Sequence, residues 1–184
     1  MSSPALQVRQ ALLGDPLTEP LVRELTHEYV TRYGPGGHAE MARYPAAEFA
    51  PPHGLLLLLL EDGRPVAGGA YRRADGRTAE LKRMWTHSAH RRRGLARRVL
   101  AELERAAAAA GYRRIVLTTG PRQPEAKALY LATGYTPLFD LGRDPVTGTG
   151  PDQGPGPGSD HAPGAGPPPA AGPLPFEKHL IAPH

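Results

Sequence analysis

Hydrophobic and polar positions alternate in part over residues 5–13, a segment that ends at Gly14. This spacing predicts an opening strand. Asp15 and Pro16 then supply a helix N-cap and a first-turn proline, and the run of residues 34–37, Gly-Pro-Gly-Gly, predicts where that helix ends. Between them, apolar residues recur at the spacing of one helix face: Leu21, Val22, Leu25, Tyr29, Val30 and Tyr33.

Six consecutive leucines, Leu55 to Leu60, form the longest apolar run of the chain. Residues 61–64 have the composition of a turn, and Pro65 to Tyr71 is a second extended segment, so the pair predicts an antiparallel hairpin. Leucine is also a good helix former, which makes a helix the alternative. The shortness of the run and the flanking Gly54 and Asp62-Gly63 favour a strand buried on both faces.

The rest of the chain predicts strands and helices in alternation. In the first of these strands Glu80, Lys82, Met84 and Thr86 alternate with Leu81, Arg83 and Trp85, and the strand carries unusually many charges. The order predicts an α/β fold with a mixed, mostly antiparallel sheet flanked by helices. The predicted elements are strands over 79–86, 115–119, 135–140 and 174–181, and helices over 94–110 and 123–133.

Glycine and proline are concentrated in one segment. The 184-residue chain has 22 of each, and residues 142–173 hold nine glycines and nine prolines in 32 positions. Within residues 143–173 the one aliphatic side chain larger than alanine is Val146, so this stretch cannot bury enough apolar area to order itself. The sequence predicts a single domain of residues 1–142 plus 174–184, with 143–173 as a flexible insertion before the last strand.

The absence of cysteine limits the chemistry of the chain, because it excludes disulfides, thiolate nucleophiles and cysteine-ligated metal sites. The six-leucine run is far shorter than the about 20 residues that a membrane helix needs, and the N-terminus lacks the features of a signal peptide. We therefore expect a cytoplasmic protein with no membrane partner. His87 and His90 have no acidic cluster beside them, and no metal is expected.

Positive charge is concentrated in residues 80–114, which hold ten Lys and Arg against three Glu in a chain of net charge +4. This local excess of seven indicates an acidic partner for the segment. Nucleic acid, anionic lipid and a phosphorylated cofactor all satisfy that requirement, and charge alone does not choose among them.

The centre of this basic segment, residues 86–98, links a predicted strand to the start of a helix. A helix N-terminus exposes about four unpaired backbone N–H groups and a partial positive charge, so it binds phosphate directly. Gly94 allows close approach of the backbone, and Ala96 is too small to shield the N–H groups. The neighbouring arginines add charge-assisted contacts. The alternative is a solvated, arginine-rich helix start without a ligand.

Residues Arg91 to Ala96 follow a short pattern: Gln or Arg, any two residues, Gly, any residue, then Gly or Ala. This is the pyrophosphate loop of the GNAT acetyltransferase superfamily, which the sequence resembles over residues 5–142 and 174–181. Three other segments are similar to family elements in the same order. They are Glu80 to Thr86 (the fourth strand), Gln123 to Tyr130 with Gly134-Tyr135 (the later helix and next strand) and Phe176 to Leu180 (the closing strand).

The resemblance implies a GNAT-like fold, acetyl-CoA as donor and an amine as acceptor. Coenzyme A carries a pyrophosphate and a ribose phosphate, which would account for the basic segment. Backbone groups of Met84 and Thr86 should pair with the pantetheine arm like an added strand, and Gln123 stands where many relatives have an Asn that contacts the cofactor. The residues that the resemblance assigns to the cofactor are Met84, Trp85, Thr86, Arg91, Arg92, Arg93, Gly94, Leu95, Ala96, Arg97 and Gln123.

Acetyl transfer needs a neutral amine, a stabilised oxyanion and a proton for the departing thiolate. Tyr130 occupies the position of the family's common thiolate acid, and a phenol of pKa about 10 remains protonated at neutral pH. The alternative for Tyr130 is a purely structural core residue. Glu80, early in the charged strand, is the candidate to accept the amine proton, through water; an ion pair with Arg83 or Lys82 is its alternative role.

The acceptor is the part of the function that the sequence leaves open. Residues 34–54, which include His38, Glu40, Tyr44, Glu48 and Phe49, are the candidates for the acceptor wall. We expect an acyltransferase, monomeric or homodimeric, that does not bind nucleic acid and acts on a small-molecule or protein amine. The second hypothesis is a noncatalytic module that binds acyl-CoA or nucleic acid through residues 91–98.

Overall fold

The computed structural model describes residues 5–141 and 172–181. The predicted insertion, residues 143–173, lies outside them except for its last two positions. The strands are β1 (Leu6–Ala11), β2 (Leu55–Glu61), β3 (Arg64–Arg73), β4 (Thr78–Thr86), β5 (Arg114–Thr119), β6 (Thr136–Pro137) and β7 (Leu174–His179). The helices are α1 (Glu19–Tyr33), α2 (Gly36–Ala42), α3 (Leu95–Ala109) and α4 (Pro124–Ala132), with short 3-10 helices η1 (Pro16–Thr18), η2 (Ala46–Phe49) and η3 (Ser88–His90).

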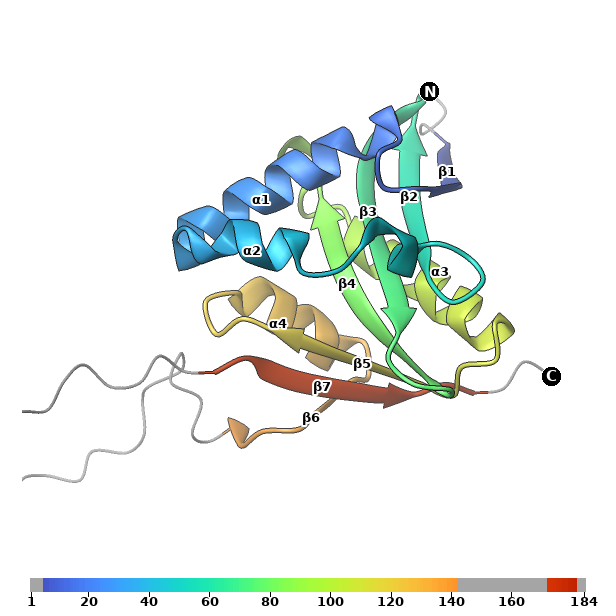
Figure 1. Ribbon diagram of the computed structural model, residues 1–184, viewed down its shortest axis with the longest axis vertical. Helices are drawn as coiled ribbons and strands as arrows, with labels where there is room; N and C mark the ends of the chain where they lie inside the picture. The colour runs from blue at the N-terminus through green and yellow to red at the C-terminus, as the bar shows by residue number, and fades with distance from the viewer. Residues whose placement is uncertain (1–4, 142–171, 182–184) are drawn as a thin grey trace, which may run out of the picture.

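The described strands form one seven-stranded sheet in the order β1-β2-β3-β4-β5-β7-β6. Only β4 and β5 run parallel to each other, and all other neighbours are antiparallel. Helices α1 and α2 lie over one face of the sheet and α3 over the other, while α4 lies beside β5 (Figure 1). The predicted fold class, a mixed and mostly antiparallel sheet flanked by helices, is confirmed.

The six-leucine segment joins the two cores of the molecule. Leu57 and Leu59 pack with α3 in one apolar cluster, and Leu56, Leu58 and Leu60 pack with α1 and Phe49 in the other. Successive strand residues point to opposite faces, so a strand that is apolar at every position can anchor helices on both sides. The prediction of a doubly buried strand is therefore confirmed.

The segment after α1 contains a helix that the sequence analysis did not predict. The chain leaves α1 at Gly34, as expected, but it forms α2 from Gly36. Gly37 makes this possible, because α2 crosses α1 so closely that a Cβ at Gly37 would lie 2.6 Å from the backbone of Tyr29. The glycine-rich run interpreted as a helix stop does end α1, at Gly34, and Gly37 within it also allows the close contact between α2 and α1. At the other end of the domain, the strand predicted over 135–140 is only two residues long, β6.

Strand β4 contains a bulge that overturns the simple alternation predicted for it. Gly68 pairs with Trp85 and Ala70 pairs with Lys82, so two residues of β4 face one residue of β3. Arg83 adopts the left-handed conformation at φ +59°. One extra residue exchanges the faces of all side chains beyond it. Trp85 consequently packs under α1, whereas Met84 packs with the cluster on the α3 face.

Strands β4 and β5 pair only at their N-terminal ends. The parallel ladder covers Thr78 to Glu80 of β4 and Arg114 to Val116 of β5. Beyond it the strands diverge, and β5 and β7 run nearly across the direction of β2, β3 and β4 (Figure 1). The edge of β4 from Leu81 onward therefore presents backbone N–H and C=O groups that no strand of the described residues pairs.

Candidate functional site

A cleft of about 450 Å³ opens where β4 and β5 separate. Residues 81–84 of β4 and 117–120 of β5 and the following loop form its floor, and side chains from α1, α2 and α4 form its walls. Cavities of this size typically bind small molecules. The cleft thus lies at the point where the sheet offers an unpaired strand edge.

The walls of the cleft are tied together by a reciprocal contact between the end of α1 and the loop before α4. Nη1 of Arg32 donates to the carbonyl oxygen of Arg122 at 2.8 Å, and Nη1 of Arg122 donates to that of Arg32 at 2.9 Å. Arg32 also forms ion pairs with Glu28 and Glu125. These contacts are exposed and individually weak, but they join the α1 wall to the α4 wall.

The predicted phosphate-binding loop forms the N-terminus of α3. Gly94 is the N-cap residue in the left-handed conformation, φ +73°, and no side chain caps this end of the helix. An added Cβ at Gly94 would meet no atom within 4 Å, so the space in front of the helix is open. The first N–H groups of α3, from Leu95 to Arg97, are thus available to an anion. This geometry fits a phosphate group.

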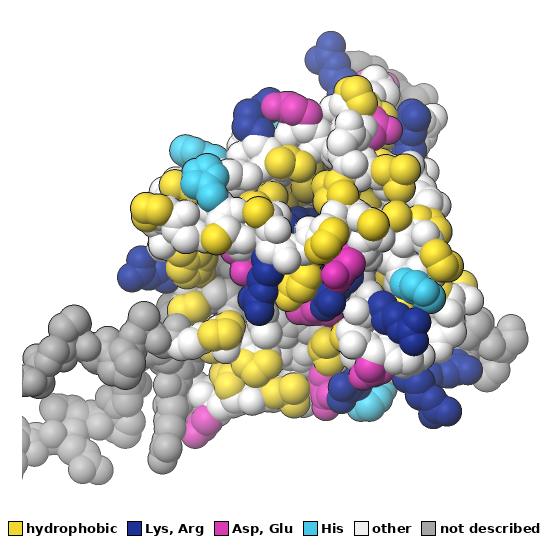
Figure 2. Space-filling view, in the orientation of Figure 1, with side chains coloured by type: hydrophobic (Ala, Val, Ile, Leu, Met, Phe, Trp, Pro, Cys, Tyr) yellow, Lys and Arg dark blue, Asp and Glu magenta, His cyan; other side chains and the backbone are white. Residues whose placement is uncertain are grey.

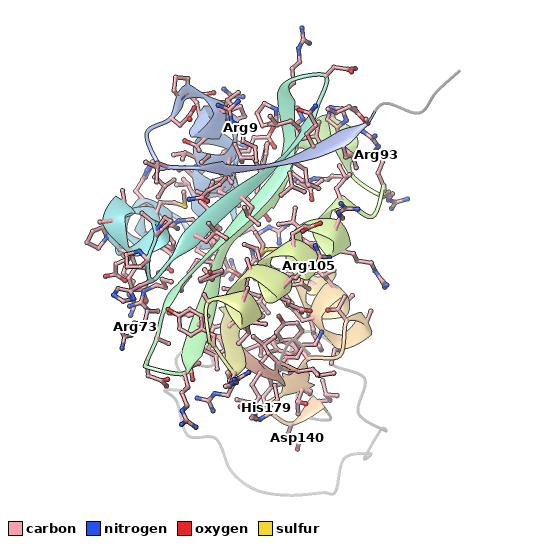
Figure 3. All side chains as sticks on the ribbon, turned by 90° about the vertical axis from the view of Figure 1, so that its right-hand side faces the viewer. Arg9, Arg73, Arg93, Arg105, Asp140 and His179 are labelled. Atoms are coloured by element: carbon pink, nitrogen blue, oxygen red, sulfur yellow. The ribbon has the colours of Figure 1, made fainter. Side chains whose placement is uncertain are left out.

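The arginines of this loop differ in their surroundings. Arg91, Arg92 and Arg97 are exposed, with no ion pair among the described residues. Arg93 instead binds Glu61 at the end of β2, with Nη2 at 2.5 Å from Oε1, and this contact lowers the pKa of Glu61. Figure 3 shows Arg93 beside the loop that leads into α3. Arg93 anchors the loop to the sheet, and the other three supply positive charge.

The three residues of β4 that the resemblance assigned to the cofactor lie on different sides of the strand. Met84 lines the cleft. Thr86 ends the strand opposite Ala67. Trp85 is buried beneath α1, where its Nε1 donates to Oε2 of Glu24 at 3.3 Å, so its indole lies outside the cleft.

Gln123 lines the cleft at the N-cap of α4. Its Oε1 accepts hydrogen bonds from the backbone N–H of Gly120 at 3.0 Å and from the hydroxyl of Thr119 at 3.2 Å. These bonds close the turn between β5 and α4. The side chain therefore shapes the cleft wall, and its Nε2 group is left to donate hydrogen bonds to other partners.

Tyr130 lines the same cleft from α4 and is 5% exposed. Its ring packs against Tyr135, with centroids 5.5 Å apart, and against Phe176 at 5.8 Å. Burial raises the pKa of Tyr130, because desolvation disfavours the phenolate. The phenol is thus held in its protonated form beside the floor of the cleft, as a proton donor requires.

Glu80 lies in an ion-pair cluster next to the cleft rather than among its lining residues. Oε2 of Glu80 is 2.5 Å from Nη1 of Arg72, and its Oε1 is 3.3 Å from Nζ of Lys82. Arg72 also binds Glu48, and Lys82 also binds Glu40. Basic and acidic side chains adjoin one another below α2 in the middle of the face shown in Figure 2. The alternative role given to Glu80, an ion pair with Arg83 or Lys82, is present with Lys82, and the second partner is Arg72 rather than Arg83.

Two residues of the cleft were not proposed as individual site residues in the sequence analysis. Glu40, expected only in the general acceptor wall, is the one carboxylate among the described lining residues. Arg83, assigned to the apolar side of an alternating strand, lines the cleft from the bulge. An arginine at an apolar position of a strand pattern was the signal that could have identified it.

Two negative findings apply to residues 5–141 and 172–181. No helix in this part of the chain is both long and apolar enough to cross a membrane. No group of three or more His, Asp or Glu side chains there is arranged to hold a metal ion.

Comparison with known proteins connects this geometry with one family. The sequence model of the acetyltransferase (GNAT) family matches residues 20–135. An uncharacterized N-acetyltransferase, YsnE of Bacillus subtilis, is 37% identical over 90 residues, which are 46% of this chain. The alignment spans 60% of that relative's length.

Solved structures share the fold at low sequence identity. An acetyltransferase from Streptococcus agalactiae superposes with a TM-score of 0.64 at 17% identity, covering 95% of this chain and 98% of that one. The PaiA N-acetyltransferase from Thermoplasma acidophilum, solved in complex with coenzyme A, gives 0.65 at 12% identity and covers 96% and 99%. The predicted fold is thus shared with both of these solved acetyltransferases.

Proposed function

The chain belongs to the acetyltransferase (GNAT) family, and from this premise we propose that it is an N-acetyltransferase that transfers the acetyl group of acetyl-CoA to a primary amine by direct attack. Family membership supports the expected acyltransferase class. The name of the Bacillus subtilis relative and the coenzyme A complex of the Thermoplasma acidophilum protein support the donor. The amine belongs to a small molecule, a peptide or a protein.

One observation carries the proposal: an uncapped helix N-terminus flanked by unpaired arginines stands at the end of a strand whose edge is open. The N–H groups of Leu95 to Arg97, with Arg91 and Arg92, would hold the pyrophosphate. The unpaired edge of β4 at Met84 would hold the pantetheine arm as a strand holds its neighbour. Acetyl-CoA supplies a thioester, whose carbonyl carbon is the electrophile.

In the reaction, the amine nitrogen forms a bond to the acetyl carbon, and the carbon–sulfur bond breaks. The acceptor ammonium loses one proton to become the attacking amine and a second as the amide forms, while the thiolate of coenzyme A gains one, so one proton is released in net. Glu80 is the proposed acceptor of the proton that the ammonium loses before attack, through water. Tyr130 is the proposed donor of the proton that the thiolate gains, because it lines the cleft and is held protonated.

Isothermal titration calorimetry tests the function against its alternative. We expect coenzyme A to bind with micromolar affinity or better and duplex DNA to show no comparable affinity. An assay of thiol release from acetyl-CoA with a panel of amines then tests transfer. Strongly salt-dependent binding of DNA without coenzyme A binding would overturn the proposal in favour of a nucleic-acid module.

The variant Glu80→Gln tests the proton acceptor. This substitution would leave Arg72 paired with Glu48 and Lys82 paired with Glu40, so the fold should be retained. We expect kcat to fall by about 100-fold at neutral pH, the lower end of the range for general base catalysis. The loss should shrink at alkaline pH, where more of the acceptor amine is already neutral. A proportionate loss at every pH would indicate that Glu80 only supports the strand.

A further inference from the structure

Arg83 is a buried charge that costs the fold stability in two ways. It is 5% exposed, and desolvation lowers the pKa of its guanidinium. Its backbone has a positive φ, which a residue with a Cβ rarely adopts. Strained backbone and buried charge that persist at a cleft commonly serve a ligand. Arg83 therefore calls for a role beyond packing.

The partners of Arg83 within the described chain are neutral. Nη2 donates to the carbonyl oxygen of Met41 at 2.7 Å, and Nη1 donates to its Sδ at 3.0 Å. The guanidinium also lies 5.5 Å from the ring centroid of Phe49. No carboxylate of the described residues forms an ion pair with it. These contacts orient the guanidinium, and the one carboxylate that acts on its charge, Glu40, does so without forming an ion pair with it.

The other cations of the cleft differ from Arg83 in their ion pairs and in their exposure to water. Among the described lining residues the cations are Arg43, Lys82 and Arg83, and the one carboxylate is Glu40. Glu40 lies 3.6 Å from both Arg43 and Lys82. Lys82 is shared with Glu80 as well, and Arg43 is largely exposed to water. Among these three cations, Arg83 is thus the one that is buried and forms no ion pair with a described carboxylate.

Arg83 lies on the side of the cleft proposed for the amine substrate, away from the loop proposed to bind the phosphates of acetyl-CoA. Its surroundings, Met41 and Phe49, belong to the α2 and η2 segment over one face of the sheet. The proposed phosphate loop instead begins α3, which covers the opposite face. The phosphates of coenzyme A therefore have their own binding groups, and Arg83 remains for the second substrate.

We propose that Arg83 binds an oxyanion of the acceptor, so that the preferred acceptor is a small amine that also carries a carboxylate or a phosphate. This inference rests on the proposed function and names the substrate class of the same cleft. A guanidinium presents parallel N–H donors that match either oxyanion.

Matched acceptor pairs test the inference by thiol release with acetyl-CoA. One pair is a free amino acid and its carboxamide, and the other is phosphoethanolamine and ethanolamine. A charge-assisted contact predicts that kcat/KM favours the anionic member of one pair by about 10–100-fold. The pair that shows the preference identifies the oxyanion. In Arg83→Met, which keeps most of the length of the side chain, the preference should disappear while affinity for coenzyme A is retained.

Two controls separate recognition from a structural role. Arg83→Lys keeps the charge without the fork and should retain part of the preference, and Lys82→Met removes a neighbouring cation that is already paired and should retain most of it. Equal losses for both members of each pair in Arg83→Met, or no preference in the wild type, would overturn the inference alone. Absence of thiol release with every amine would overturn the proposed function and this inference together.

Discussion

Replacing Gly94 with glutamate is expected to abolish measurable coenzyme A binding while the protein stays folded. The carboxylate would stand in the open space before the α3 N-terminus and repel the pyrophosphate. Two like charges about 4 Å apart repel by about 4 kcal/mol near a protein surface, and each 1.4 kcal/mol is about tenfold in affinity. Calorimetry should therefore show a loss of at least about 100-fold.

The variant Gly94→Ala separates charge from backbone strain. Gly94 has φ +73°, and that conformation costs a residue with a Cβ about 1–2 kcal/mol. Alanine should lower the melting temperature by a few degrees, yet it should keep most of the coenzyme A affinity, because its methyl group meets no atom and carries no charge. Wild-type affinity in a folded Gly94→Glu protein would show that the phosphates bind elsewhere.

The uncapped, basic start of α3, the proposed phosphate loop, could be predicted from sequence because its properties are local. A glycine before an amphipathic helix and a run of arginines predict an anion site within about ten residues, and neither feature depends on distant parts of the chain. The structure adds one distinction that the sequence does not contain. Arg93 is held by Glu61, 32 positions earlier, so the arginines of the loop are not equivalent.

The acceptor side could not be predicted in the same way, because its geometry depends on tertiary contacts. Helix α2 begins at residues of low helix propensity, and it exists because Gly37 allows contact with the backbone of α1. The bulge at Arg83 has no glycine or asparagine to mark it. The family resemblance assigned Trp85 to the cofactor, but the bulge turns its indole under α1.

The divergence of β4 and β5 links these elements into one cleft. Sequence patterns identified both strands but carry no information on where their pairing ends. Glu80 is the last residue of the ladder, and the residues after it line the cleft. The predicted role of Glu80 consequently depends on a water path, whereas Tyr130 lines the cleft itself.

Replacing Tyr130 with phenylalanine is expected to lower kcat by about 10–1000-fold, around or below the usual range for general acid catalysis, with little change in coenzyme A affinity. The variant removes only the hydroxyl group and keeps the ring contacts with Tyr135 and Phe176. Because burial raises the pKa of Tyr130, the phenol is protonated at and well above neutral pH. The activity ratio of wild type to variant should therefore stay constant across neutral and moderately alkaline pH.

The variant Tyr135→Phe is the matched control for this prediction. Tyr135 is a buried tyrosine whose ring touches that of Tyr130, but it does not line the cleft. If proton donation by Tyr130 sets the rate, Tyr135→Phe should retain nearly full kcat, whereas Tyr130→Phe should not. Equal and small losses in both variants would assign the two hydroxyl groups to packing. Protonation of the thiolate would then fall to solvent, even where the phosphate loop binds coenzyme A as proposed.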